Sequence, residues 1–196
     1  MRVEARPPSA CSWYLRPFFW NQRRKYGKVL DAALLWARSP KLFVAVALLY
    51  GAIDRRGSPL EPALRSLLTV RVSQLNHCRF CIDINAATLL KHGVAEVKLW
   101  ALEDWRGSTL FDQRERVALE YAEAMTLSDV GVGDELMARL KRHFDHDAIV
   151  ELSALIAFQN MSSKFNAALA VPPQGFCQVL RAQPADGAAQ IGGKLP

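Results

Sequence analysis

Two cysteines, Cys78 and Cys81, lie three positions apart where the sequence predicts the start of a helix. Residues at this spacing share one helix face, so the sulfur atoms can form a disulfide or bind one metal ion. A helix N-terminus presents unpaired N–H groups and the positive end of the dipole, which favour thiolate over thiol. The apolar stretch that follows ends at Gly93, a residue suited to a helix C-terminus. This spacing indicates thiol or metal chemistry.

The other sequence features indicate a reducing compartment. Four cysteines are too few for a disulfide scaffold in 196 residues. The N-terminus has no signal-peptide pattern, and the longest apolar run, residues 42–53, is too short to span a bilayer. We therefore expect a cytoplasmic protein, in which an isolated Cys-x-x-Cys is redox-active or metal-binding rather than structural.

A zinc site is the alternative use of these cysteines. Zinc needs four ligands, and only His77 clusters with the pair along the chain. Cys11 and Cys177 lie near the chain ends and have no partner at ligand spacing. We therefore expect no metal and no cofactor, although a site shared between subunits stays open as an alternative.

Positive charge is concentrated at the N-terminus of the chain. The net charge is +6, and residues 1–41 contain nine Lys and Arg residues against only Glu4 and Asp31. Such an arm can bind nucleic acid or an anionic membrane. Aromatic residues are interleaved with the charges: Trp13, Tyr14, Phe18, Phe19 and Trp20. This mixture favours packing onto the chain's own core or a neighbouring subunit, so we expect neither a nucleic-acid nor a membrane partner.

The hydrophobic pattern predicts helices throughout, because no segment alternates with period two beyond a few residues. The expected helices are 17–26, 29–37, 41–53, 62–75, the cysteine helix ending near 93, 94–102, 112–126, 134–144 and a long one from Asp145 or Asp147 to about 171. Residues 41–53 are apolar nearly all round, which predicts a buried helix. Asp112 and Glu115 form a capping-box pattern. The predicted fold class is all-α.

The same pattern suggests three regions. Residues 1–34 are a basic aromatic arm with short helices, residues 35–173 a helical domain, and residues 174–196 a largely disordered tail rich in Gly, Ala, Pro and Gln. Half of the residues (51%) are hydrophobic, which is rich for a monomer. We expect a homo-oligomer, with part of this surface between subunits.

Three segments together resemble a known family. They are Leu64 onward (Leu-Arg-Ser-Leu-Leu-Thr-Val-Arg-Val-Ser-Gln-Leu-Asn-His-Cys-Arg-Phe-Cys), Phe111 onward (Phe-Asp-Gln-Arg-Glu-Arg-Val-Ala-Leu-Glu-Tyr-Ala-Glu-Ala-Met-Thr) and Phe158 onward (Phe-Gln-Asn-Met-Ser-Ser-Lys-Phe-Asn). The pattern resembles the carboxymuconolactone decarboxylase/alkylhydroperoxidase D-like (AhpD-like) family. The resemblance covers about residues 35–173, most of the chain, and its most specific feature is the Cys-x-x-Cys.

The resemblance implies an AhpD-like helical domain, with the Cys-x-x-Cys at the N-terminus of a core helix, that assembles into dimers, trimers or hexamers. It also implies a peroxiredoxin-like, antioxidant peroxidase cycle. By position, Cys81 attacks the hydroperoxide, and Cys78 resolves the product into a redox-active disulfide. The expected partners are a hydroperoxide or disulfide substrate and a thiol reductant protein that returns the electrons.

The chain departs from the family at its proton relay. The family's glutamate, twelve positions before the first cysteine, is Ser66 here, and its histidine, four positions after the second, is Asn85. A general base contributes ~10²–10⁴-fold in rate, so we expect a slow peroxidase. His77 either raises the thiolate fraction of Cys78 or faces solvent as a loop residue. His92 lies about three turns along the helix from Cys81, too far to act on it directly.

A non-redox function is the remaining alternative: a carboxymuconolactone decarboxylase-like enzyme or a small-molecule-binding protein with a cavity beside Asn85 and Ser66. Polar residues on the last helix could line that cavity: Gln159, Asn160, Ser163 and Asn166. Polar residues of this kind more often cap neighbouring helices or hydrogen-bond across an interface.

Overall fold

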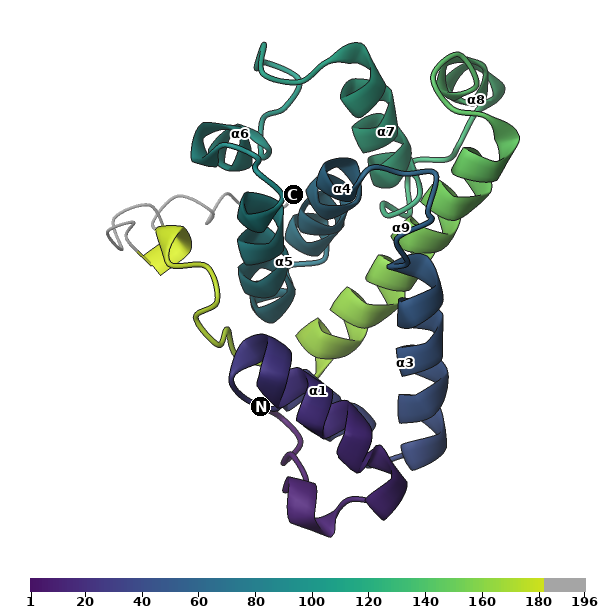
Figure 1. The fold of residues 1–196 in the computed structure, drawn as a ribbon. Helices are drawn as coiled ribbons and strands as arrows, with labels where there is room; N and C mark the ends of the chain where they lie inside the picture. Colours follow the sequence, from purple (N-terminus) through teal and green to yellow (C-terminus); the bar gives the residue numbers. More distant parts are fainter. Residues whose placement is uncertain (182–196) are drawn as a thin grey trace.

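The computed structural model describes residues 1–181, and every regular element in that range is a helix (Figure 1). The α-helices are α1 (Arg16–Tyr26), α2 (Asp31–Trp36), α3 (Pro40–Ile53), α4 (Pro62–Leu75), α5 (Arg79–Lys91), α6 (Glu96–Ala101), α7 (Gln113–Ala124), α8 (Asp134–Leu140) and α9 (His146–Ala168). Three short 3₁₀ turns are η1 (Pro8–Ala10), η2 (Trp13–Leu15) and η3 (Val179–Arg181). The all-α prediction is confirmed.

Helix α4 is the centre of the fold, because α5, α7 and α9 all pack against it. Pro62 begins the helix at a position where its missing N–H costs nothing. The apolar stripe along α4 is fully buried at Leu67, Leu68, Val70 and Val72, whose exposed fractions are 1% or less. A short turn after α4 reverses the chain into α5, so the two helices form an antiparallel pair (Figure 1).

The local sequence signals at two other helix ends are confirmed. Asp112 accepts the N–H of Glu115 at 2.8 Å, and the Glu115 carboxylate accepts the N–H of Asp112 at 3.0 Å, so the capping box starts α7. Of the two candidates for α9, Asp145 is the cap and accepts the N–H of Ala148 at 2.7 Å. These contacts span three residues, which is why the sequence alone predicts them.

The N-terminal arm is not separate from the rest of the protein. Apolar side chains of the arm and of α2 and α3 form a second buried cluster together with the start of α5 and the chain after α9; its members include Leu15, Phe19, Leu35, Phe43, Cys78, Phe80, Cys81 and Val171. The rings of Phe18 and Phe19 both pack edge-on against Phe43. We call residues 5–44, which contribute to this cluster, the N-terminal cover.

Helix α3 corrects the sequence prediction, because it is apolar but not buried. Only Phe43 and Ile53 are buried, whereas Leu42, Leu48 and Leu49 are 54%, 65% and 46% exposed. The reason is its position at the margin of the molecule, where it packs on α2 and α9 and leaves its outer face uncovered (Figure 1). Within residues 1–181, no helix combines the length and the apolar character needed to cross a membrane.

The predicted disordered tail begins with a fixed segment. Residues 174–177, the C-terminal strap, lie against α5, and Asp83 accepts the backbone N–H groups of Gln174, Gly175 and Cys177 at 2.6–2.8 Å. The strap also holds the cover, because the Gln174 side-chain oxygen accepts the N–H of Asp31 at 3.2 Å. The predicted tail continues through η3, and residues 182–196 lie outside the described residues.

Candidate redox site

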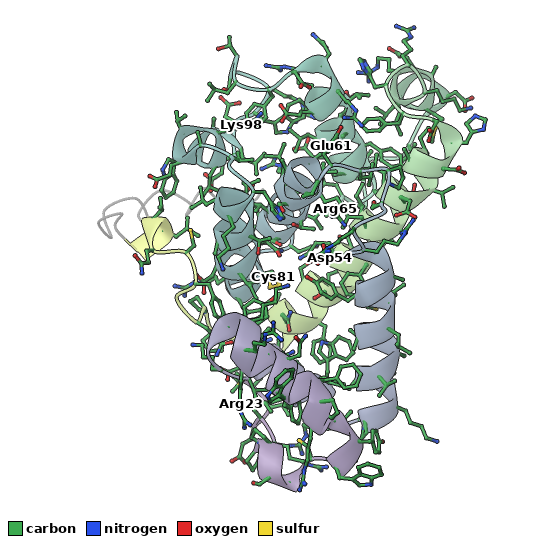
Figure 2. All side chains as sticks on the ribbon, viewed as in Figure 1. Arg23, Asp54, Glu61, Arg65, Cys81 and Lys98 are labelled. Carbon is green, nitrogen blue, oxygen red and sulfur yellow. A yellow bond between two sulfur atoms is a disulfide. The ribbon has the colours of Figure 1, made fainter. Side chains whose placement is uncertain are left out.

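Cys78 and Cys81 form a disulfide at the first turn of α5, with Cα atoms 5.2 Å apart. Cys78 is the N-cap residue of the helix, and its sulfur accepts the N–H of Cys81 at 3.2 Å. The sequence spacing places both cysteines at this terminus for a local reason, since N-cap and third helical position face each other in any helix. Figure 2 shows Cys81 where the start of α5 meets α9.

Both sulfur-bearing residues are buried, with Cys78 1% and Cys81 2% exposed. The apolar cluster around them includes Leu15 and Phe19 of the N-terminal cover. An oxidant or reductant therefore reaches the sulfur atoms only when part of this packing moves. The sequence predicted the pair itself but not its enclosure by the arm, because that contact joins residues about sixty positions apart.

One polar side chain from a distant helix reaches the disulfide. Asn166 of α9 donates from Nδ2 to the sulfur of Cys81 at 3.4 Å, and the residue is only 2% exposed. Its Oδ1 is buried and has no hydrogen-bond partner. An unsatisfied buried acceptor of this kind costs about 1–3 kcal/mol. Sequence analysis placed Asn166 only among the polar residues of the last helix, since its 85-residue separation from Cys81 hides the contact.

Asn85 belongs to a neutral hydrogen-bond network between α4, α5 and α9. Its Nδ2 donates to the Ser73 hydroxyl oxygen at 3.1 Å, and Gln159 Nε2 donates to the same oxygen at 2.9 Å. The Ser73 hydroxyl itself donates to the Thr69 carbonyl at 2.5 Å. None of these groups takes up a proton near neutral pH, so the network holds the helices together and supplies no general base.

Ser66 is hydrogen-bonded to His92 rather than to Asn85. Its hydroxyl lies 2.8 Å from His92 Nδ1, with Ser66 buried on α4 and His92 exposed at the end of α5. The two family relay positions therefore take part in separate hydrogen-bonded groups. His77 is exposed in the turn before α5, in the left-handed conformation with φ 52°.

Polar residues of α9 hydrogen-bond to the ends of neighbouring helices. This is the structural role that the sequence analysis gave as the alternative to lining a cavity. Asn76 Nδ2 donates to Asn160 Oδ1 and to the Ser163 hydroxyl, both at 2.8 Å. Asn160 Nδ2 in turn donates to the Thr126 hydroxyl at 3.0 Å. Both polar atoms of the Asn160 side chain are thus bonded, in contrast to Asn166.

A buried carboxylate, Glu123 on α7, was missed by sequence analysis. It accepts hydrogen bonds from Arg71 Nε and Trp105 Nε1, both at 2.8 Å, and pairs with Arg106 at 2.6 Å. Burial raises the pKa of this carboxyl, but hydrogen bonds from Trp105, Arg106 and Arg71 outweigh burial, so its pKa lies below the ordinary value. The sequence shows only a charged residue between two alanines, which gives no sign of burial. This cluster ties α4 to α7.

No group of three His, Cys, Asp or Glu side chains within residues 1–181 is arranged to hold a metal ion. Cys11, partly exposed in the arm, and Cys177, buried at the end of the strap, are both free thiols. Burial is the main cause that raises the pKa of the Cys11 thiol above its ordinary value, which lowers its thiolate fraction.

The chain is similar in sequence to a known protein family and to a bacterial relative. Residues 40–124 match the carboxymuconolactone decarboxylase family. The uncharacterized protein YnjA of Escherichia coli is 43% identical over 173 residues, which cover 88% of this chain and 95% of YnjA.

Two solved structures have the same fold. The alkylhydroperoxidase AhpD core of an uncharacterized peroxidase-related protein from Ralstonia eutropha superposes with a TM-score of 0.81, at 20% identity over 89% of this chain and 93% of that one. A variant of the debrominase Bmp8 in complex with 2,3,4-tribromopyrrole superposes with a TM-score of 0.79, at 22% identity over 91% and 95% of the two chains. At these identities the likeness establishes the fold alone.

Proposed function

The chain belongs to the carboxymuconolactone decarboxylase family and has its AhpD-like helical fold, and on this premise we propose that it is a thiol–disulfide oxidoreductase that reduces a hydroperoxide. The observation that carries the proposal is the Cys78–Cys81 disulfide on the first turn of α5. A pair three residues apart at a helix N-terminus is close enough for a disulfide to form and open, and the helix dipole favours thiolate over thiol there.

The cycle starts from the dithiol. The Cys81 thiolate attacks the outer oxygen of the hydroperoxide and breaks the O–O bond, giving Cys81 sulfenic acid and an alkoxide that takes a proton to leave as the alcohol. The Cys78 thiol then attacks the Cys81 sulfur, which closes the disulfide and releases water. A thiol reductant protein, which supplies two electrons and two protons, restores the dithiol. Assigning Cys81 as the attacking residue follows its position in the family pattern.

The proposed peroxidase is slow, because Asn85 and Ser66 replace the groups that would accept the thiol proton. Asn85 is bonded to Ser73, and Ser66 to His92. Their supporting role is structural in this proposal: both hold α4 and α5 together, Asn85 one turn after Cys81 and Ser66 at the other end of α5. His77 is exposed in the turn before α5 and has no assigned part in the cycle.

We propose in addition that the protein works as a homo-oligomer in the reducing cytoplasm. The support is the exposed apolar side chains of α3 and α9, among them Leu48, 65% exposed, and Val150, 68% exposed. Helices α3 and α9 pack against each other, and Tyr50 lies against Phe158 at the junction. A second copy of the chain would bury these side chains, which gain free energy on leaving water.

The first measurement is hydroperoxide consumption by the reduced protein. The second is the redox state of Cys78 and Cys81 in glutathione buffers, determined by alkylation and mass measurement. Both are made on metal-free and on zinc-loaded protein. We expect stoichiometric disulfide formation and a potential within roughly −120 to −270 mV, the range of dithiol oxidoreductases. The matched control is Cys11→Ser with Cys177→Ser, which leaves the pair intact and should not change the result.

Two outcomes would overturn the proposal. Thiols that stay reduced in hydroperoxide and in disulfide buffers would favour the non-redox alternative, a decarboxylase-like or ligand-binding protein. Protection of both thiols by stoichiometric zinc would favour a metal site shared between subunits.

A further inference from the structure

The two sulfur atoms of the pair have different hydrogen-bond donors. The sulfur of Cys78 accepts the backbone N–H of Cys81 at 3.2 Å, so its donor is the helix N-terminus itself. The sulfur of Cys81 has the side-chain amide of Asn166, whose Nδ2 lies 3.4 Å away. The helix alone would therefore favour Cys78 as the thiolate.

We propose that Asn166 is a catalytic residue that holds Cys81 as the thiolate in the reduced protein, and so selects Cys81 rather than Cys78 as the attacking sulfur. The inference rests on the proposed function in one respect: the pair must open to the dithiol. When two electrons and two protons arrive from a reductant, the S–S bond breaks. The Cys78 sulfur keeps one proton as a thiol, and the Cys81 sulfur releases the other to solvent.

The physical argument is a difference between two states of one hydrogen bond. A disulfide sulfur is a weak neutral acceptor, whereas a thiolate carries a full charge, and charge-assisted hydrogen bonds are roughly twice as strong as neutral ones. The donor therefore stabilises the reduced, ionised form more than the oxidised form. The contact is buried, with Asn166 and Cys81 both 2% exposed, so little water competes for the sulfur.

The charged groups nearest along α5 do not take this role. Arg79 and His77 are exposed, and the Asp83 carboxylate is bonded to three backbone N–H groups of the C-terminal strap. The buried aliphatic and phenylalanine members of the surrounding cluster carry no hydrogen-bond donor. Trp36 and Tyr26 at its edge are stacked on Phe165 and packed against Phe176, and within residues 1–181 neither is hydrogen-bonded to a sulfur of the pair. Asn166 is therefore the side-chain donor on which the charge of Cys81 depends.

The unpartnered oxygen of Asn166 is the second, independent observation. Asn160, six residues earlier on α9, is an amide with a structural role, because both of its polar side-chain atoms are hydrogen-bonded. Asn166 Oδ1 is buried without a partner, although its Nδ2 is directed at the reacting sulfur. Unsatisfied buried groups need a reason beyond stability, and orienting Nδ2 toward Cys81 supplies that reason.

The experiment compares two single-cysteine proteins, each in the Cys11→Ser/Cys177→Ser background. One carries Cys78→Ser and retains Cys81, and the other carries Cys81→Ser and retains Cys78. The thiolate of each is followed by its ultraviolet absorbance as the pH is raised, with and without Asn166→Leu. We expect the titration midpoint of Cys81 to move up by about one to two pH units and that of Cys78 to stay in place.

Two further variants keep the test interpretable. Asn166→Asp has almost the same shape as the wild type but no N–H donor. Its negative charge adds to the effect, so the titration midpoint of Cys81 should lie at a still higher pH. This variant also tests the inference if Asn166→Leu fails to fold. Asn160→Leu, on the same helix, is the matched control and should move neither midpoint. In the two-cysteine protein, loss of the donor should make the reduction potential more negative, by about 30 mV for each tenfold change in the equilibrium constant.

An unchanged Cys81 midpoint, or equal movement of both midpoints, would overturn the inference, since the second result would indicate a general structural change. These titrations need no hydroperoxide. Failure of the proposed function, seen as a wild-type pair that does not cycle, is thus distinguishable from failure of the Asn166 assignment.

Discussion

The Asp83 carboxylate accepts the backbone N–H of Gly175 at 2.6 Å, across 92 positions of sequence. The same carboxylate, 5% exposed, also holds Gln174 and Cys177, so one side chain fixes the C-terminal strap to the cysteine helix. Because Asp83 is two residues after Cys81, the strap is fixed to the same end of the helix that carries the redox pair.

Replacing Asp83 by Asn should lower the free energy of unfolding by about 2–3 kcal/mol, because hydrogen bonds to a charged group each contribute about 1.5–3 kcal/mol and the amide retains one acceptor. Urea unfolding at neutral pH measures this change. Asp129→Asn, at an exposed carboxylate in the turn before α8, is the control and should change stability by less than about 0.5 kcal/mol. Equal stability of the two variants would mean that the strap contributes nothing to folding.

Glu123→Gln should lower the free energy of unfolding by about 3 kcal/mol, because it leaves Arg71 buried without its counter-ion. Since hydrogen bonds hold the pKa of Glu123 below its unfolded value, its stabilisation is present above about pH 5 and is lost as the pH falls through the lowered pKa. Urea midpoints from pH 7 to pH 3 should therefore fall less for the variant. Glu120→Gln removes a surface pair with Arg139 and should cost under about 1 kcal/mol at every pH.

Restoring the relay should increase peroxidase activity. The double variant Ser66→Glu/Asn85→His introduces an acid and a base at the two family positions, and general-base help is worth up to ~10²–10⁴-fold. Gln159 still bonds Ser73 when Asn85 is changed, so the α4–α9 contact survives. The rate of hydroperoxide consumption is the measurement, with each single variant as control. An unchanged rate would indicate that proton transfer does not limit turnover.

The exposed face of α3 should mediate self-association. Leu48→Glu places a charge on a side chain that is 65% exposed, so it should lower the molar mass measured by light scattering without reducing helix content. Val97→Glu, at a 58% exposed position on α6, is the matched control and should leave the mass unchanged. A wild-type protein that is monomeric at every concentration would contradict the oligomer proposal.

The N-terminal cover should control access to the disulfide. Leu15→Ala removes a fully buried side chain from the cover, and such changes cost about 2–5 kcal/mol. If the cover opens locally, dithiothreitol should reduce the disulfide at least about tenfold faster. Leu119→Ala, equally buried but in the core around α4, is the control. Equal acceleration in both variants would mean that reduction requires global unfolding.

The features that could be predicted from sequence are those set within a few residues. The capping box of Asp112 and Glu115, the cap at Asp145 and the closeness of Cys78 and Cys81 all depend on helix geometry, which the spacing determines. The site features that could not be predicted join distant segments: Asn166 with Cys81, and Asp83 with the strap. The apolar pattern of residues 41–53 correctly predicts a helix. It does not indicate whether another helix of the same chain covers the apolar side chains of that helix.

Gln174 joins the N-terminal cover to the helix that carries the redox pair. Its backbone N–H binds Asp83 on the cysteine helix, while its side chain and its carbonyl hold Asp31 and Lys28 of the cover. One residue therefore fastens both the cover and the cysteine helix to the strap. Opening of the whole cover would break the contacts of Gln174 with Asp31 and Lys28, so the loss of these contacts is part of the free-energy cost of exposing the buried bond.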